Sequence, residues 1–189
     1  MLGFGASEIG YQSVTLPTVS RLLNSALDAG LNLIDTAACY ANSEELIGAA
    51  IGGRRAECYL MTKCGHSASL PLPEWTPALI TRSIEQSLRR LRTDYLDVVQ
   101  LHSCDAATTR NDDLIAALLT ARDRGHTRFI GYSGDGEDAA YAVATGIFDT
   151  LQISVSVADQ QALDTVLPEA VARDMGIIAK RPLANAAWI

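Results

Sequence analysis

Seven short apolar runs, spaced along the whole chain, most constrain what this sequence can fold into. Each run is rich in β-branched residues and nearly continuous in apolar character, which is typical of buried strands in a parallel sheet. The runs are LGFGA from Leu2, LNLID from Leu31, CYLMTK from Cys58, LDVVQLH from Leu96, RFIGYS from Arg128, LQISVS from Leu151 and GIIAKR from Gly176. The sequence therefore predicts about seven strands.

Amphipathic stretches with helical spacing separate these runs. One has an apolar face from Val19 to Leu27, and Gly30 follows it as a left-handed C-cap. Another has Thr76 as its N-cap and Pro77 at the first helical position. Further helices are expected from Ser43, around residues 114–119 before Gly125, over 136–145, and over 160–174, where Pro168 bends the helix.

Strand and helix thus alternate throughout, which is the pattern of stacked βαβ units. Two architectures share this pattern, a doubly wound open sheet and a (β/α) barrel. The first run, GFGASEIG, has only an approximate glycine pattern and no clear GxGxxG opening a helix. We therefore expect a TIM-type (β/α) barrel, formed as a single domain over residues 1–189.

Charge and cysteine content narrow the class of protein. A net charge of −7 argues against a nucleic-acid binder, which needs a dense basic face. The chain has no run of about 18 apolar residues and no secretory leader pattern at its start, so we expect a cytoplasmic protein that does not associate with membranes. Four cysteines without CxxC spacing predict reduced thiols rather than a disulfide framework.

Polar residues stand at the end of almost every predicted strand. They are Asp35 and Tyr40 after the second, Lys63 after the third, His102 after the fourth, Ser133 after the fifth, Gln152 in the sixth, and Lys180 and Arg181 after the seventh. In a barrel these ends meet at one mouth, where catalytic groups gather. A charged Lys63 at the end of an apolar strand needs a counterion, and Asp35 is the nearest candidate.

The phenol of Tyr40 can act as a proton donor in this cluster of strand-end residues. Tyrosine titrates near pH 10 in water, and a neighbouring cation such as Lys63 would lower its pKa. A tuned Tyr40 protonates an oxygen that develops negative charge, while His102 donates a hydrogen bond to the same oxygen. The arrangement suits addition to a carbonyl, and reduction further requires a hydride-carrying cofactor.

Several motifs resemble those of the aldo-keto reductase family. DTAACYANSEELIG from Asp35 resembles that family's DTAxxYGxSExxLG segment, MTKCG carries its strand-end lysine at Lys63, and VVQLHSCD carries its LH pair at His102. GYSGD from Gly131, LQISVS from Leu151 and GIIAKRPLA from Gly176 are similar to its later strand ends. Two positions depart from the pattern, because Gly134 and Asp135 follow Ser133 where the family often has Asn, and Ala41 replaces a common Gly.

The resemblance implies a barrel that binds NADP(H), or alternatively NAD(H), and reduces small aldehydes or ketones. It assigns Tyr40 as general acid, Lys63 and Asp35 as the pair that tunes it, and His102 as the group that orients the carbonyl. It places the nicotinamide carboxamide against Ser133 and Gln152. It places Lys180, Arg181, Pro182 and Leu183 near the pyrophosphate of the cofactor.

The family's barrel has eight strands, whereas this sequence predicts about seven, without an eighth strand or C-terminal loop. Open sheet edges promote association. Three outcomes are open: a partner chain completes the ring, a terminal segment covers the gap, or the fold is marginal and cofactor affinity is lost. Of these we expect self-association, as a homo-oligomer that covers the open barrel edges.

Two alternatives stay open. The chain is also consistent with a catalytically weak or inactive barrel that acts as a cofactor-sensing or regulatory module. Thiol and imidazole groups near the mouth raise a zinc site as the other alternative, although their spacing matches no standard ligand pattern. These groups belong to Cys39, Cys64, His66, His102 and Cys104.

Overall fold

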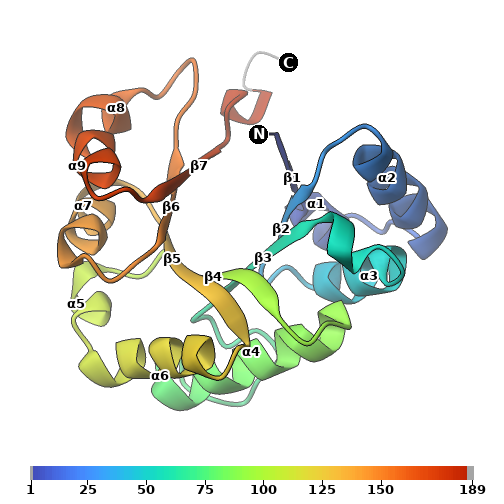
Figure 1. Ribbon diagram of the computed structural model, residues 1–189, viewed down its shortest axis with the longest axis horizontal. Coiled ribbons are helices and arrows are strands. Elements are labelled where there is room, and N and C mark those ends of the chain that lie inside the picture. The colour runs from blue at the N-terminus through green and yellow to red at the C-terminus, as the bar shows by residue number, and fades with distance from the viewer. Residues whose placement is uncertain (1, 187–189) are drawn as a thin grey trace.

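A computed structural model describes residues 2–186 of the chain. Its seven strands form one curved sheet, and all neighbouring strands are parallel. The strands are β1 (Gly3–Gly5), β2 (Leu33–Asp35), β3 (Tyr59–Cys64), β4 (Leu96–His102), β5 (Thr127–Ser133), β6 (Thr150–Ser154) and β7 (Gly176–Lys180). Figure 1 shows the sheet curling round a central space, with β1 and β7 facing each other across an opening.

The strands follow one another in the sheet in chain order, from β1 to β7. A doubly wound sheet reverses its strand order at a switch point, so this topology excludes that alternative. The prediction of an incomplete (β/α) barrel with seven strands is confirmed. Among residues 2–186, β1 pairs with β2 alone and β7 with β6 alone. The expected covering of these edges by a second copy stays a prediction, as does the single domain over residues 1–189.

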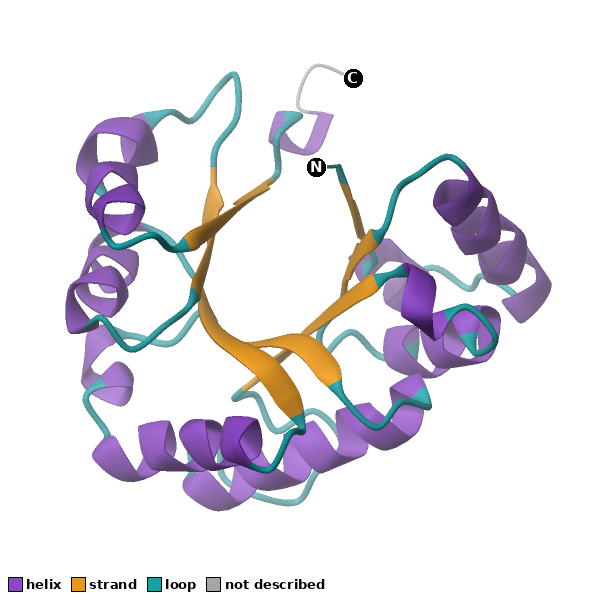
Figure 2. Cartoon of the chain, in the orientation of Figure 1, coloured by secondary structure: helices purple, strands orange, loops and turns teal. Residues whose placement is uncertain are grey.

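Helices lie on the outside of the curved sheet (Figure 2). They are α1 (Ser7–Tyr11), α2 (Leu16–Asp28), α3 (Ser43–Ile51), α4 (Pro77–Leu91), α5 (Ala106–Thr109), α6 (Asp112–Asp123), α7 (Gly136–Thr145), α8 (Gln161–Thr165) and α9 (Leu167–Ala172). Two short 3-10 helices add Arg55–Glu57 and Ala184–Ala186. No helix within residues 2–186 is long and apolar enough to cross a membrane.

The helix ends follow the local chemistry of the sequence. Thr76 accepts a hydrogen bond from the backbone N–H of Leu79 and caps α4, with Pro77 in the first turn. Gly30 adopts φ +84° after α2, the left-handed conformation expected of a residue that ends a helix. Pro168 does more than bend the last helix, because α8 and α9 are separate helices and Pro168 lies in the first turn of α9.

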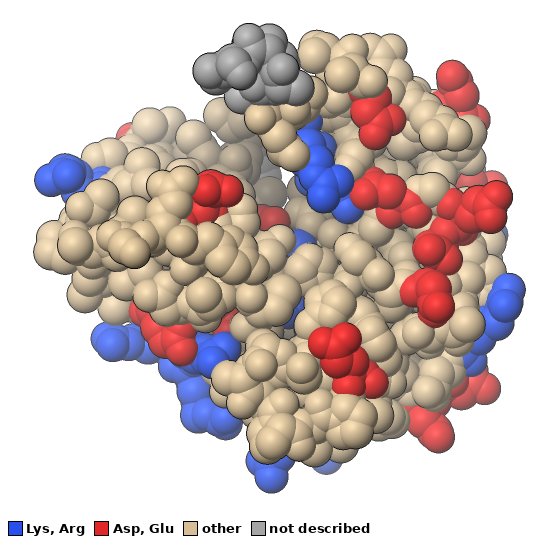
Figure 3. Space-filling model, turned by 180° about the vertical axis from the view of Figure 1, so that it is seen from behind, with Lys and Arg blue, Asp and Glu red and all other residues tan. Residues whose placement is uncertain are grey.

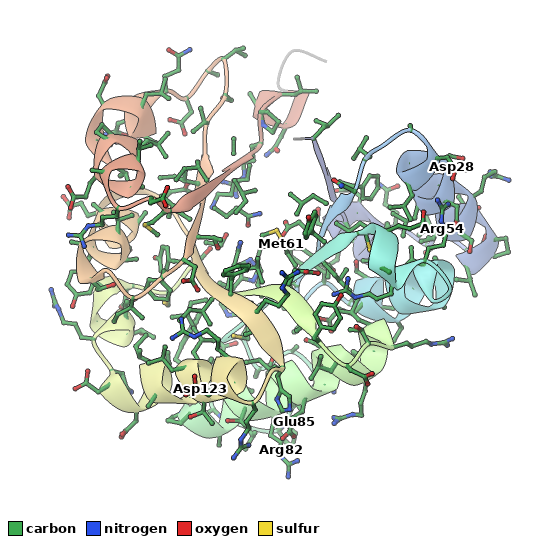
Figure 4. All side chains as sticks on the ribbon, in the orientation of Figure 1. Asp28, Arg54, Met61, Arg82, Glu85 and Asp123 are labelled. Atoms are coloured by element: carbon green, nitrogen blue, oxygen red, sulfur yellow. The ribbon has the colours of Figure 1, made fainter. Side chains whose placement is uncertain are left out.

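The hydrophobic core lies between the sheet and its helices. Alternate strand residues such as Ile34, Leu60, Val99 and Ile130 belong to this core and are almost fully buried. Because successive strand side chains point to opposite faces, the residues between them face the inside of the curve. Met61, labelled in Figure 4, belongs to this second set. The inner face therefore receives the polar residues that end the strands.

Candidate active site

Lys63 is the most deeply buried charged group of the site. Its side chain is 2% exposed, and its Nζ donates to Oδ1 and Oδ2 of Asp35, each at 2.8 Å. A third hydrogen bond runs from Nζ to the backbone carbonyl of Thr36, also at 2.8 Å. All three ammonium protons thus have acceptors, which offsets the cost of burying the cation. The expected pairing of Asp35 with Lys63 is present in the structure.

The segment after β2 carries Tyr40 to the same mouth. Thr36 and Ala38 donate backbone hydrogen bonds to Met61 and Lys63, so the chain still runs along β3 beyond the end of β2. A short turn then brings Tyr40 round, and the next residue, Ala41, adopts φ +42°. This positive φ favours glycine, so the Ala41 substitution noted in the sequence lies at a conformationally demanding position.

Gly10 of α1 packs directly against the turn that carries Tyr40. A Cβ at residue 10 would lie 2.1 Å from the Tyr40 carbonyl oxygen, so the close approach requires glycine. The Ser43 hydroxyl donates to the carbonyl of Ala6 at 2.9 Å and also contacts Thr36 Oγ1. Ser43 therefore ties the segment before α1 to the segment that carries Tyr40. It is the first residue of α3, whose N-cap is Asn42.

Tyr40 lies between Lys63 and His102. The Lys63 Nζ is 5.2 Å from the centre of the Tyr40 ring, and the Tyr40 and His102 ring centres are 5.7 Å apart, edge to face. Burial raises the pKa of the Tyr40 phenol above its usual value, and the negative charge of Asp35 adds to the rise. The pKa of Tyr40 is thus raised overall rather than lowered as expected, chiefly because its ring is buried.

His102 is a neutral imidazole at physiological pH. Burial lowers its pKa to about 3, and the charge of Lys63 contributes further. Its Nδ1 lies 3.4 Å from the Cys39 Sγ, and which of the two atoms donates depends on the tautomer. No sequence pattern predicts this contact between residues 63 positions apart. A neutral imidazole donates one hydrogen bond and accepts one, so His102 retains a donor for a ligand oxygen when its other nitrogen accepts from Cys39.

His66 and Trp75 form a wall beside His102. The His66 ring centre is 5.3 Å from that of His102 and 5.0 Å from that of Trp75. Glu74 holds His66 from outside, with its Oε2 3.3 Å from His66 Nδ1. Within residues 2–186, no three His, Cys, Asp or Glu side chains form a group suited to a metal ion, so the zinc alternative has no support.

Ser133 and Gln152 meet at the ends of β5 and β6. The Ser133 hydroxyl donates to Gln152 Oε1 at 2.8 Å, and both side chains are buried. Gly134 follows Ser133 because a Cβ there would lie 2.5 Å from the Tyr132 ring. The departure from the family's Asn at this position thus has a steric counterpart in Tyr132.

The end of β7 brings two further cations to the mouth. Lys180 Nζ lies 3.0 Å from Asp135 Oδ2, and Arg181 Nη1 lies 3.5 Å from the same oxygen. Arg181 also donates to Ser154 Oγ at 2.8 Å. Figure 3 shows basic side chains in the central hollow and acidic side chains beside them. Asp135 has no role predicted from the sequence, although it follows the end of β5 by two residues.

Pro182 and Leu183 follow this pair as an exposed segment, with Leu183 65% exposed. The predicted residues thus fall into three clusters, around Lys63, around Ser133 and around Lys180. Arg181 relates the third cluster to the first, because its positive charge acts to lower the pKa of Tyr40 against the dominant effect of burial.

The fold and this site define a (β/α) barrel with a polar mouth at the carboxyl ends of its strands. The model of the aldo/keto reductase family matches residues 1–188, and the chain belongs to that family. It is similar to the uncharacterized oxidoreductase YqkF of Bacillus subtilis, with 28% identity over 191 residues, 95% of this chain and 61% of the relative. The chain thus spans about three fifths of that curated relative.

Two solved structures resemble the fold closely. The holo form of the aldo-keto reductase AKR11C1 from Bacillus halodurans has a TM-score of 0.85 and 25% identity, covering 97% of this chain and 62% of that one. An aldo-keto reductase from Klebsiella pneumoniae in complex with NADPH has a TM-score of 0.79 and 28% identity, covering 98% and 64%.

Proposed function

We propose that the protein is an NADP(H)-dependent oxidoreductase that reduces a small aldehyde or ketone to the alcohol. The observation that carries this proposal is the packing of Tyr40 between the Lys63–Asp35 pair and the neutral His102. Family membership and the NADPH complex of a structural relative support the choice of cofactor. NAD(H) is the alternative dinucleotide.

The residues present suit such a dinucleotide. Ser133 and Gln152 form a buried polar pair of the kind that can hydrogen-bond a carboxamide. Lys180 and Arg181 are the cations available for its phosphates, and Pro182 and Leu183 continue the same segment. NADPH, when bound, supplies the hydride that adds to the carbonyl carbon.

Tyr40 is the proposed general acid. Its raised pKa keeps the phenol protonated at neutral pH, so the proton is in place before reaction. The phenol then donates this proton to the former carbonyl oxygen, since an alkoxide is far more basic than a phenolate. His102 orients the substrate by donating a hydrogen bond to that oxygen. The positive charge of Lys63, which Asp35 holds in place, stabilises the phenolate that Tyr40 becomes.

A second candidate is a catalytically weak barrel that binds the cofactor as a sensing module. The raised pKa of Tyr40 favours it, because a weaker acid gives a smaller driving force for proton transfer. The two candidates differ in turnover and share cofactor binding. We assign the protein to a reducing compartment such as the cytoplasm, because all four cysteines are free thiols.

The test combines cofactor titration with two tyrosine variants. NADPH and NADH are titrated by fluorescence, and carbonyl reduction is assayed with a panel of small aldehydes and ketones. Tyr40→Phe should lower turnover by about 10²-fold or more while cofactor affinity stays unchanged. Tyr59→Phe is the matched control, because Tyr59 is exposed at the opposite end of β3.

Three outcomes decide between the candidates. Unaltered turnover in Tyr40→Phe would refute the role of Tyr40. Cofactor binding without turnover in the parent protein would select the sensing module. An absence of binding at about 1 mM NADPH or NADH would refute both candidates.

A further inference from the structure

Asp135 makes contacts that its position in the sequence does not explain. It directly precedes α7, and an Asp at this position usually accepts a hydrogen bond from the first turn of the helix. Its side chain makes no such cap. It points instead toward β6 and β7, where its two carboxylate oxygens find other donors.

Three donors hold the carboxylate there. The backbone N–H of Ser154 donates to Oδ1 at 2.7 Å, while Lys180 Nζ and Arg181 Nη1 lie 3.0 and 3.5 Å from Oδ2. Burial would raise the pKa of Asp135, but the hydrogen bond from Ser154 and the pairing with Lys180 outweigh it and hold this pKa below its usual value. The donors thus form a site matched to an anion, and Asp135 occupies it.

Within residues 2–186, Lys180 and Arg181 form an ion pair with no carboxylate other than Asp135. Lys180 is 16% exposed, and burial lowers its pKa although Asp135 opposes the effect. Arg181 adopts φ +56°, a left-handed conformation that is costly for a residue with a side chain. Apart from Asp135, Arg181 is held by Ser154 Oγ. Both cations therefore depend on Asp135 as their counterion.

We propose that Lys180, Arg181 and the Ser154 N–H form an anion cradle for a phosphate or carboxylate group of a ligand, and that Asp135 fills this cradle until the ligand displaces it. Phosphate and carboxylate oxygens take the same charge-assisted hydrogen bonds that Asp135 now accepts. The cradle lies on β6 and β7, next to the Ser133–Gln152 pair, since the backbone N–H of Gly134 donates to the carbonyl of Gln152.

The structure has space for the Asp135 carboxylate when a ligand displaces it. A cavity of about 300 Å³ lies beside Asp135 between α7 and α8, and Gly136, Ser154 and Thr165 are among its lining residues. The uncapped first turn of α7 offers backbone N–H groups to an Asp at this position. Asp135 would then act as a positioning and selectivity residue that sets how tightly an anionic ligand binds. This inference rests on the proposed function, in which the ligand is the dinucleotide.

The test removes the charge of Asp135 but keeps its shape. Asp135→Asn retains an oxygen that can accept from the Ser154 N–H, and it no longer competes for the two cations. We expect inorganic pyrophosphate and NADPH to bind about two- to fivefold more tightly to this variant, measured by calorimetry. Glu137→Gln is the matched control, since it removes the same charge from the first turn of α7 and should leave both affinities unchanged.

A double variant and a second anion test whether the gain in affinity comes from the cradle and which ligand group the cradle binds. The gain should vanish when Arg181→Gln is added to Asp135→Asn, because the cradle then lacks one of its cations. Acetate distinguishes the source of the anion: a gain for acetate without one for pyrophosphate would assign the cradle to a substrate carboxylate. Unchanged or weaker binding of every anion to Asp135→Asn, or an equal gain in Glu137→Gln, would overturn the cradle.

Failure of the cradle and failure of the proposed reductase give different results. Tighter pyrophosphate binding in Asp135→Asn, with no carbonyl reduction by either protein, would keep the cradle and remove the reductase. If the parent protein and Asp135→Asn both reduce carbonyls and bind each ligand, NADPH or pyrophosphate, with the same affinity as each other, the reductase is kept and the cradle is removed.

Discussion

Lys63 Nζ lies 2.8 Å from both carboxylate oxygens of Asp35, at the ends of two adjacent strands of the barrel. The pair is almost enclosed, since the exposed fractions of the Lys63 and Asp35 side chains are 2% and 18%. A buried ion pair contributes little net stability compared with apolar residues, but the loss of one partner leaves the other charge uncompensated.

Asp35→Asn should therefore destabilise the protein by about 3–5 kcal/mol, because Lys63 loses its counterion inside the barrel. Adding Lys63→Met to this variant removes the orphaned charge and should recover most of the loss. Urea unfolding of the two variants and the parent protein measures the difference. A double variant no more stable than Asp35→Asn would show that the pair does not act through charge compensation.

The identity of this pair was accessible from the sequence for a physical reason. Strand side chains alternate between two faces, and parallel strands end at one edge, so polar residues at strand ends meet. Asp35, Lys63 and His102 follow this rule, and so do Ser133 and Gln152. The same rule explains the strand order, which follows from consecutive βα units.

Other features depend on contacts that no strand rule specifies. The pKa of Tyr40 depends on how deeply its ring is buried and on how closely Asp35 compensates Lys63, which only packing determines. The side chain of Asp135 leaves its expected helix cap for Lys180 across the mouth, a contact between residues far apart in the sequence. The division of the last helix into α8 and α9 shows that Pro168 can start a helix as well as bend one.

The acid side of the pH–stability profile should depend on His102. Its pKa falls from 6.5 to about 3 on folding, so between these values the unfolded chain binds a proton that the folded protein does not. Stability is thus lost as pH falls below about 6.5, by at most about 1.4 kcal/mol per pH unit from this group.

His102→Asn should flatten that part of the profile. Unfolding free energies of the parent and variant, measured at several pH values between 7 and 4, give the difference in slope directly. His126→Asn serves as the control for a general loss of imidazole. Parallel profiles for the parent and His102→Asn would contradict a depressed pKa at His102.

Asp97 should be a stability residue at the opposite end of the barrel from the mouth. Its side chain is 5% exposed and binds Arg55, Arg128 and the backbone N–H of Leu60 at 2.8, 3.2 and 2.8 Å. Asp97→Ala leaves these donors without their acceptor and should cost about 3 kcal/mol.

The exposed pair of Arg82 and Glu85 on α4, labelled in Figure 4, provides the comparison. Glu85→Ala should change stability by no more than about 0.5 kcal/mol, because solvent screens the pair. Thermal unfolding of the two variants would measure the contrast. Equal losses of stability in Asp97→Ala and Glu85→Ala would show that burial does not determine how much the Asp97 contacts stabilise the protein.

Gly65 should tolerate no side chain, because two separate constraints act on it. Its φ is +120°, which residues with a side chain rarely adopt, and an added Cβ would lie 1.9 Å from the Trp75 ring. Gly65→Ala should therefore destabilise the protein by about 2 kcal/mol and displace Trp75 from His66. Gly53→Ala is the matched control, since a Cβ there meets no atom within 4 Å.

A second substitution separates the two constraints at Gly65. Trp75→Leu added to Gly65→Ala removes the ring but leaves the backbone conformation unchanged, so it should recover only the steric part of the loss relative to Trp75→Leu alone. Urea unfolding gives these stabilities. Because Gly65 directly follows β3, two residues after Lys63, carbonyl reduction should fall with Gly65→Ala and not with Gly53→Ala. Equal stability of Gly65→Ala and Gly53→Ala would contradict both constraints.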